Sequence, residues 1–97
     1  MGRVRRGKRR GRQSGFLVTW DVNSADRPTA RKVYRFVYGE TTFKGGRTYH
    51  YPGFVEKEGV RYLGQSVLFV PPPLLPGIDA FLTQSSVDHE VTPATIG

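Results

Sequence analysis

The sequence contains no cysteine and only two histidines, His50 and His89, among its 97 residues. Disulfides and thiolate-bound zinc are therefore excluded, and two imidazoles are too few for a histidine-rich metal centre. We expect no cofactor and no bound metal. Packing alone must then stabilise the fold, and the aromatic side chains, 12% of the sequence, each offer a large area to bury.

Long apolar runs are also missing. Residues 16–20 follow basic residues, as the apolar region of a signal peptide does, but Asp21 ends this run well short of the roughly 7 to 15 residues required. Residues 67–82 form the most apolar stretch, yet prolines, a glycine and an acid interrupt it, and a bilayer span needs about 20 apolar residues. We therefore expect a cytoplasmic protein without a membrane partner.

Acidic residues are absent from the first twelve positions, which are rich in arginine. The cations there are Arg3, Arg5, Arg6, Lys8, Arg9, Arg10 and Arg12. They account for the whole formal charge of +7, because bases and acids balance in the rest of the chain. The planar donors of arginine match phosphate oxygens and stack on bases. A polyanion is the expected partner, and we prefer nucleic acid to anionic lipid because an interfacial segment would also need an apolar helical face.

The same charges suggest how the chain is divided. The glycines and like charges of the arginine-rich N-terminal segment oppose a compact state of that segment on its own. We predict that residues 1–15 form an Arg/Gly-rich nucleic-acid-binding arm that is disordered when free. Residues 16–97 should form a single α+β domain with a modest two-layer core.

Hydrophobic alternation predicts a first strand over residues 16–22. Capping residues at 23–26, Pro28 in the first turn and Gly39 as a C-cap predict a helix of about three turns. After a polar loop at 40–47, the remaining elements are predicted as strands over 48–56 and 60–70, which pair around Gly59, a helix over 74–84 and an edge strand over 89–96. The order β, α, β, β, α, β predicts the ferredoxin-like arrangement, a four-stranded antiparallel sheet with two helices on one face.

Further cations recur within the predicted domain. Arg27, Arg31 and Arg35 follow one another at four-residue intervals and form a stripe along the first helix. Both phosphate binding and an ordinary solvated face are consistent with this stripe. Lys44 and Arg47 flank two glycines that could wrap a phosphate, but the spacing matches no nucleotide-binding loop, so a plain turn is preferred.

Two short segments resemble the CRISPR-associated protein 2 family. Residues 16–24 (FLVTWDVNS), followed by a basic helix, are similar to an apolar first strand that ends in an aromatic-Asp pair. Residues 64–72 (GQSVLFVPP) resemble the strand that leads into that family's second helix. The resemblance extends over 16–39 and 61–96, and it implies a ferredoxin-like fold, a homodimer on duplex DNA and metal-dependent cleavage at Asp21.

The chain departs from that family in its arginine arm, in the insertion at 40–59 and in the absence of an acidic ending to the matched strand. A nuclease centre needs carboxylates that converge on divalent ions, and Asp21 has no obvious companion except its copy in a homodimer. We prefer a role for Asp21 and Asn23 in shaping the turn and capping the helix.

Three aromatic residues, Tyr49, Tyr51 and Phe54, could stack on bases as the sheet aromatics of RNA-recognition domains do. Core or hairpin packing is the preferred interpretation, because the characteristic paired motif is absent.

The arm resembles the basic extensions of ribosomal proteins. We therefore expect a non-enzymatic RNA-binding structural protein, ribosomal or ribosome-associated, whose arm threads into folded rRNA beside neighbouring ribosomal proteins. The alternative is a metal-dependent nuclease or spacer-integration dimer on DNA, similar to CRISPR-associated protein 2. No catalytic residue is assigned. The binding residues are expected to be the arm cations with Arg27, Arg31, Arg35, Lys44 and Arg47.

Overall fold

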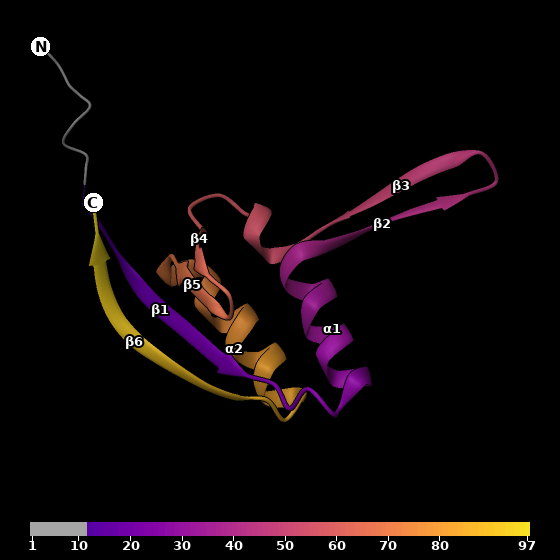
Figure 1. Cartoon of the computed structure of the whole chain (residues 1–97). Helices are drawn as coiled ribbons and strands as arrows, with labels where there is room; N and C mark the ends of the chain where they lie inside the picture. Colours follow the sequence, from indigo (N-terminus) through magenta and orange to yellow (C-terminus); the bar gives the residue numbers. More distant parts are fainter. Residues whose placement is uncertain (1–11) are drawn as a thin grey trace, which may run out of the picture.

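The computed structural model describes residues 12–97, so the arm cations from Arg3 to Arg10 lie outside the described residues. The described chain is α+β, with a four-stranded antiparallel sheet, two α-helices and a second, two-stranded sheet (Figure 1). Its helices and strands are β1 (Gln13–Asp21), α1 (Arg27–Tyr38), β2 (Gly39–Lys44), β3 (Arg47–Pro52), the 3-10 helix η3 (Phe54–Glu56), β4 (Arg61–Gly64), β5 (Val67–Val70), the 3-10 helix η4 (Pro72–Leu74), α2 (Leu75–Gln84) and β6 (Asp88–Ile96).

The four strands of the main sheet lie in the order β4-β5-β1-β6. As predicted, the first strand is interior and the last is at an edge. β1 pairs with β6 along its whole length, from Gln13 opposite Ile96 to Asp21 opposite Asp88, and with β5 on its other side. The register between β4 and β5 shifts between Tyr62 and Gly64, as a glycine within a strand often indicates.

One face of this sheet forms the core. Val18 of β1 lies opposite both Leu68 of β5 and Val91 of β6, and cross-strand partners project to the same side of a sheet. Both helices cover that side (Figure 1). Since helical side chains three or four residues apart share a face, each helix buries one narrow stripe. The stripes consist of Val33 and Val37 in α1 and of Ile78 and Leu82 in α2.

Three phenylalanine rings connect the helices. The rings of Phe36 in α1 and Phe81 in α2 stack with their centroids 3.9 Å apart and an interplanar angle of 6°. On its other side Phe36 stacks on Phe54 of η3 at 5.5 Å. The turn that follows β3 is thereby attached to the same packing that holds α1 on α2.

A second close contact occurs on the opposite face of the sheet. Phe69, which is 1% exposed, lies over Gly15 of β1. A Cβ atom on Gly15 would come within 2.6 Å of Cζ of Phe69 and of the carbonyl oxygen of Val70. Glycine is therefore required at this point of an interior strand.

The structure corrects the predicted middle of the chain. Residues 40–47, expected as a loop, contain most of β2 and the turn after it, and β3 pairs with β2 instead of with residues 60–70. The hairpin predicted around Gly59 is therefore wrong, although Gly59 does adopt a positive φ of 90°, as a turn glycine can. The second half of the predicted pair is itself two strands, β4 and β5, joined at Gln65 and Ser66.

The reason for this pairing lies in two adjacent glycines. Gly45 and Gly46 have φ angles of 59° and 79°, the values that a two-residue turn needs when it matches the twist of a hairpin. Lys44 and Arg47 pair across this turn. A turn lies at the two glycines, as preferred from the sequence. Of the strands on either side of it, β2 was missed, whereas β3 overlaps the strand predicted over 48–56, which ends at Pro52 and is followed by η3.

Candidate nucleic-acid interface

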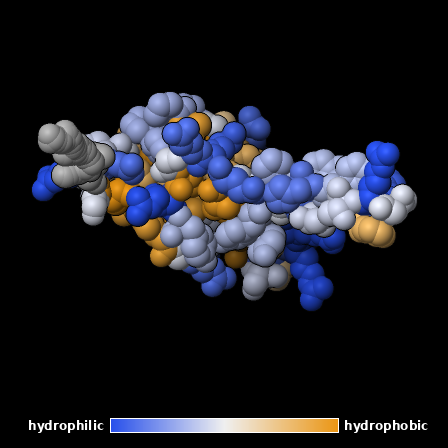
Figure 2. Space-filling model, turned by 90° about the horizontal axis from the view of Figure 1, so that it is seen from above, coloured by the Kyte–Doolittle hydropathy of each residue, from blue (hydrophilic) through white to orange (hydrophobic). Residues whose placement is uncertain are grey.

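The β2-β3 hairpin projects from the body as an arm of its own (Figure 1). Every residue of β3 is exposed. Figure 2 shows this projection coloured mostly pale to deep blue, while the orange apolar surface gathers over the body. A two-stranded hairpin is marginally stable alone, and this one adds nothing buried to the core along β3.

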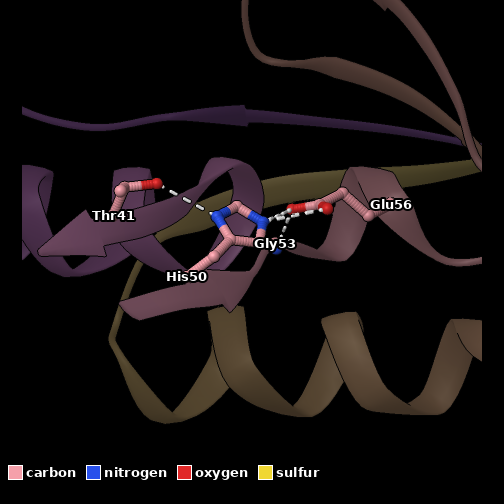
Figure 3. A network of polar contacts seen from close by, with 4 residues as sticks. All are labelled: Thr41, His50, Gly53 and Glu56. Atoms are coloured by element: carbon pink, nitrogen blue, oxygen red, sulfur yellow. Dashed lines mark hydrogen bonds and ion pairs between the residues drawn. The ribbon is translucent and has the colours of Figure 1, made fainter. Parts of the chain in front are cut away.

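The base of the hairpin is fixed by a polar network (Figure 3). Nδ1 of His50 lies 3.0 Å from the hydroxyl of Thr41 across the two strands, and Nε2 lies 3.0 and 3.1 Å from the two carboxylate oxygens of Glu56. The carboxylate also accepts a 2.7 Å hydrogen bond from the backbone N–H of Gly53. This hydrogen bond, followed by the one with His50, lowers the pKa of Glu56.

Two glycines allow the backbone of the hairpin base to pack directly against the backbone at the end of α1. A Cβ on Gly53 would lie 2.3 Å from the carbonyl carbon of Tyr38 and 2.4 Å from the backbone nitrogen of Gly39. Gly39 itself has a φ of 82°, and its N–H closes the last turn of α1 on the carbonyl oxygen of Arg35. Backbone therefore touches backbone where α1 ends and the hairpin begins.

One face of the hairpin combines tyrosines with charges. In the register of the pair, Glu40, Thr42 and Lys44 of β2 lie opposite Tyr51, Tyr49 and Arg47 of β3. Because opposite partners and alternate residues share a face, these six side chains lie on one side. Tyr49 and Tyr51 are 41% and 57% exposed.

This face borders a groove of about 900 Å³ that reaches the last turn of α1. Its lining consists of Arg35, Glu40, Thr42, Phe43, Lys44, Tyr49 and Tyr51. Nε of Arg35 forms an ion pair with the carboxylate of Glu40, and the Arg35 side chain remains 58% exposed. The groove therefore has aromatic rings on one wall and cations from both the helix and the hairpin.

The remaining cations of the helix lie farther from the groove. Arg27, Arg31 and Lys32 are exposed, so the stripe faces solvent along α1, which is consistent with both interpretations. At a rise of 1.5 Å per residue, Arg27 is about 12 Å along the axis from Arg35. The structure thus brings Arg35 and Lys44 together in one groove, with Arg47 next to Lys44, while Arg27 and Arg31 continue away along α1.

The described root of the N-terminal arm is Arg12, which is exposed. β1 begins at Gln13, three residues before the predicted start of the strand. Gln13 and Ser14 line a surface pocket together with Lys57 and Glu58, which follow the hairpin and η3. No residue of β2 or β3 lines this pocket, and the hairpin projects from the opposite side of the body (Figure 1).

The predicted base-stacking candidates separate in the structure. Phe54 is buried in the core, as the preferred interpretation states, whereas Tyr49 and Tyr51 are exposed on the hairpin. The sequence signal for their exposure is the absence of any apolar alternation opposite them in β2. More widely, the expectation that the aromatic side chains are buried is wrong for five exposed residues, Tyr34, Phe43, Tyr49, Tyr51 and Tyr62.

A second tyrosine group lies on the other side of α1. Tyr38 contacts both Tyr34, at a centroid distance of 4.7 Å, and Tyr62 of β4, at 5.9 Å. Burial and then the hydrogen bond with Tyr62 raise the pKa of Tyr38. These three side chains line a pocket with Trp20 and Asp21 that carries no cation.

The position of Asp21 differs from the preferred interpretation. The cap of α1 is Asp26, whose carboxylate accepts a 3.3 Å hydrogen bond from the N–H of Thr29. Asn23 shapes the preceding turn by accepting from the N–H of Ala25 at 2.9 Å. Asp21 is exposed and lies opposite Asp88 in the β1-β6 register. In residues 12–97 no group of three or more histidines and acids could hold a metal ion.

No protein-family model, curated protein or solved structure matches this chain. Of the helices in the described residues, none combines the length and the apolar character that crossing a bilayer requires.

Proposed function

We propose that this protein is a non-enzymatic, RNA-binding structural protein of the ribosome or of a ribosome-associated particle. The observation that carries the proposal is the charge distribution. The whole net charge of +7 resides in the first twelve residues, and the body adds exposed cations on α1 and on the hairpin. Arginine-rich segments neutralise phosphates and release counterions, which gives strong binding that reads RNA shape more than sequence.

The geometry of the body supports the same proposal. The first residues of β1, next to Arg12, share a pocket with Lys57 and Glu58, whereas the hairpin projects from the other side of the body (Figure 1). A folded RNA that spans the body could therefore contact the arm on one side and the groove beside Arg35 on the other. The body serves as the anchor that fixes where the arm enters the RNA.

The finer fold assignment belongs to this proposal too. When the β2-β3 hairpin is set aside as an insertion, the remaining elements run β, α, β, β, α, β, and their sheet order is compatible with a ferredoxin-like body. We propose that the hairpin is an added binding element on such a body.

The test is equilibrium binding to a structured RNA, with a variant in which all seven arm cations are replaced by glutamine. This variant keeps the length of the chain and leaves every residue from Gln13 onward unchanged. We expect at least about a hundredfold loss of affinity at 0.1 M salt and an unaltered thermal unfolding of the body. Equal affinity of the two proteins would contradict the proposal. Cosedimentation with ribosomal particles in high salt tests whether the protein belongs to such a particle.

A second candidate, a nuclease or integration subunit similar to CRISPR-associated protein 2, is favoured by one observation. Asp21 and Asp88 lie opposite each other on β1 and β6, where cross-strand Cβ atoms are about 5 Å apart. Incubation of DNA and RNA with Mg²⁺ or Mn²⁺ separates the two proposals. Cleavage that disappears in Asp21→Ala would replace the RNA-binding proposal, and intact substrates would leave it in place.

A further inference from the structure

We infer that the groove between the hairpin and α1 binds unpaired bases of a single-stranded nucleic-acid segment, which stack on Tyr49 and Tyr51. This inference rests on the proposed function and adds a second mode of binding to it. The arm contacts phosphates without regard to the bases, whereas the groove would require a strand whose bases are free.

The first support is the exposure of the rings. β3 carries two exposed tyrosines, spaced two residues apart on one face. Residues i and i+2 of a strand are about 6.7 Å apart along it, roughly twice the 3.4 Å rise between successive stacked bases. The spacing of the two tyrosines therefore matches bases two steps apart in a stacked strand, or neighbouring bases of a strand that is not stacked.

The second support is the charge around the rings. The groove is lined by Arg35 and Lys44, and Arg47 lies opposite Lys44 across the turn. Glu40 is the one acid among the lining residues of this groove. Binding of single strands without sequence preference combines such a cationic groove, which follows the backbone, with aromatic rings on which bases stack.

The third support is how firmly the hairpin is held. The contacts of His50 with Thr41 and Glu56, together with the backbone approach at Gly53, fix the hairpin to η3 and to the end of α1. The two walls of the groove, one from α1 and one from the hairpin, therefore keep a defined spacing. A preorganised site loses less conformational entropy when it binds its ligand.

The charges also decide between occupants. A second copy of this chain would bring its own Lys44 and Arg47 against the same cations, which opposes a symmetric contact through this face. A strand of nucleic acid brings phosphates to the cations and flat apolar rings to the tyrosines. Single-stranded nucleic acid is therefore the occupant to which the groove is complementary.

The experiment compares three proteins: the native full-length chain, Tyr49→Thr/Tyr51→Thr and Tyr49→Phe/Tyr51→Phe. Threonine keeps the strand preference and removes the ring, whereas phenylalanine keeps the ring. The probes are an eight-residue oligouridylate, an abasic strand with the same number of phosphates, and a duplex of the same length, each titrated at about 0.3 M salt to weaken the contribution of the arm. Tyr62→Thr is the matched control, since Tyr62 is 56% exposed but lies in β4, outside the groove.

We expect the threonine pair to bind oligouridylate at least about tenfold more weakly than the native chain, because each stacked base contributes substantially to binding. The phenylalanine pair and Tyr62→Thr should bind it as the native chain does. The abasic strand should bind weakly and equally to all of them. Equal binding of oligouridylate by the threonine and phenylalanine pairs would overturn the inference, as would native binding of the abasic strand as tight as that of oligouridylate.

These failures are distinguishable from failure of the proposed function. If the groove inference alone is wrong, the native chain still binds structured RNA through the arm, and the glutamine variant of the arm loses that binding. If the native chain binds none of these nucleic acids, both are wrong. A circular dichroism spectrum and an unfolding curve for each variant establish that the hairpin substitutions leave the body folded.

Discussion

Nε2 of His89 in β6 lies 2.8 Å from Oδ1 of Asp79 in α2, and Nδ1 of the same ring lies 2.8 Å from the carbonyl oxygen of Val87. Both partners are acceptors, so both ring nitrogens must carry a proton to form both hydrogen bonds. The imidazolium form is therefore favoured. The Val87 carbonyl first, and then the Asp79 carboxylate, raise the pKa of His89 above its ordinary value. This contact holds the edge strand to the second helix.

The sign of the resulting pH dependence follows from the raised pKa. Protonated His89 stabilises the folded chain fully below the unfolded pKa of about 6.5, and this stabilisation is lost as the pH rises through the folded-state pKa. We expect the melting temperature of the native chain to fall between about pH 6 and pH 8, and the fall to be smaller in His89→Gln and in Asp79→Asn. Identical pH profiles of the native chain and both variants would show that the contact does not contribute.

Substitution of Gly53 should loosen the hairpin base. A Cβ there would collide with backbone atoms of Tyr38 and Gly39, and backbone cannot rotate away as a side chain can. We expect Gly53→Ala to lower the free energy of unfolding by about 1 to 3 kcal/mol, measured by urea denaturation. Gly77→Ala is the matched control, because nothing lies within 4 Å of its added Cβ in α2, and it should stabilise by about 0.5 to 1 kcal/mol. The same sign for both variants would be inconsistent with this packing.

Removal of the middle ring of the phenylalanine stack should weaken the attachment of α1 to α2. Phe36 stacks on Phe81 and on Phe54, and Phe36→Leu keeps an apolar side chain while it removes both stacked pairs. We expect a loss of about 1 to 2 kcal/mol of unfolding free energy. Phe43→Leu serves as the control, because Phe43 is 74% exposed on the hairpin and the change should remain within about 0.5 kcal/mol.

Neutralisation of the acid in the groove should strengthen binding. Glu40 is paired with Arg35, so Glu40→Gln removes a negative charge and releases a guanidinium for phosphate. We expect oligouridylate to bind about fivefold more tightly at low salt, the equivalent of one charge at about 4 Å in water, and the gain to shrink as salt is added. Glu58→Gln, an exposed acid outside the groove lining, should leave the affinity nearly unchanged. Weaker binding by Glu40→Gln would mean that the ion pair organises the groove.

Elements in which apolar residues recur at the period of a strand or a helix were predictable from the sequence. β1, α1, α2 and β6 lie within a few residues of their predicted positions, because each has one buried face that imposes a period on its residues. The capping residues predicted at 23–26 include the N-cap, Asp26, but the capping role preferred for Asp21 and Asn23 was wrong. The sequence alone could not decide between these three side chains, since all can accept a backbone hydrogen bond.

The hairpin could not be recognised in the same way because neither of its faces is buried against the core along β3. Without a buried face there is no apolar alternation, and the polar β2 resembles a loop. The adjacent glycines Gly45 and Gly46 were the remaining signal, since such a pair favours a two-residue hairpin turn. Lys44 and Arg47 were identified from their charge as candidate binding residues. Their position beside Tyr49 depends on the pairing of β2 with β3, which the sequence did not reveal.

The most direct test of the central claim is the salt dependence of structured-RNA binding by the native chain and by the variant with glutamine at the seven arm cations. If the arm neutralises about seven phosphates, the logarithm of the binding constant should fall with the logarithm of the salt concentration at a slope of about −5. The glutamine variant should show a much shallower slope, set by the body alone. The same slope in both proteins would contradict the claim that the arm supplies the electrostatic binding.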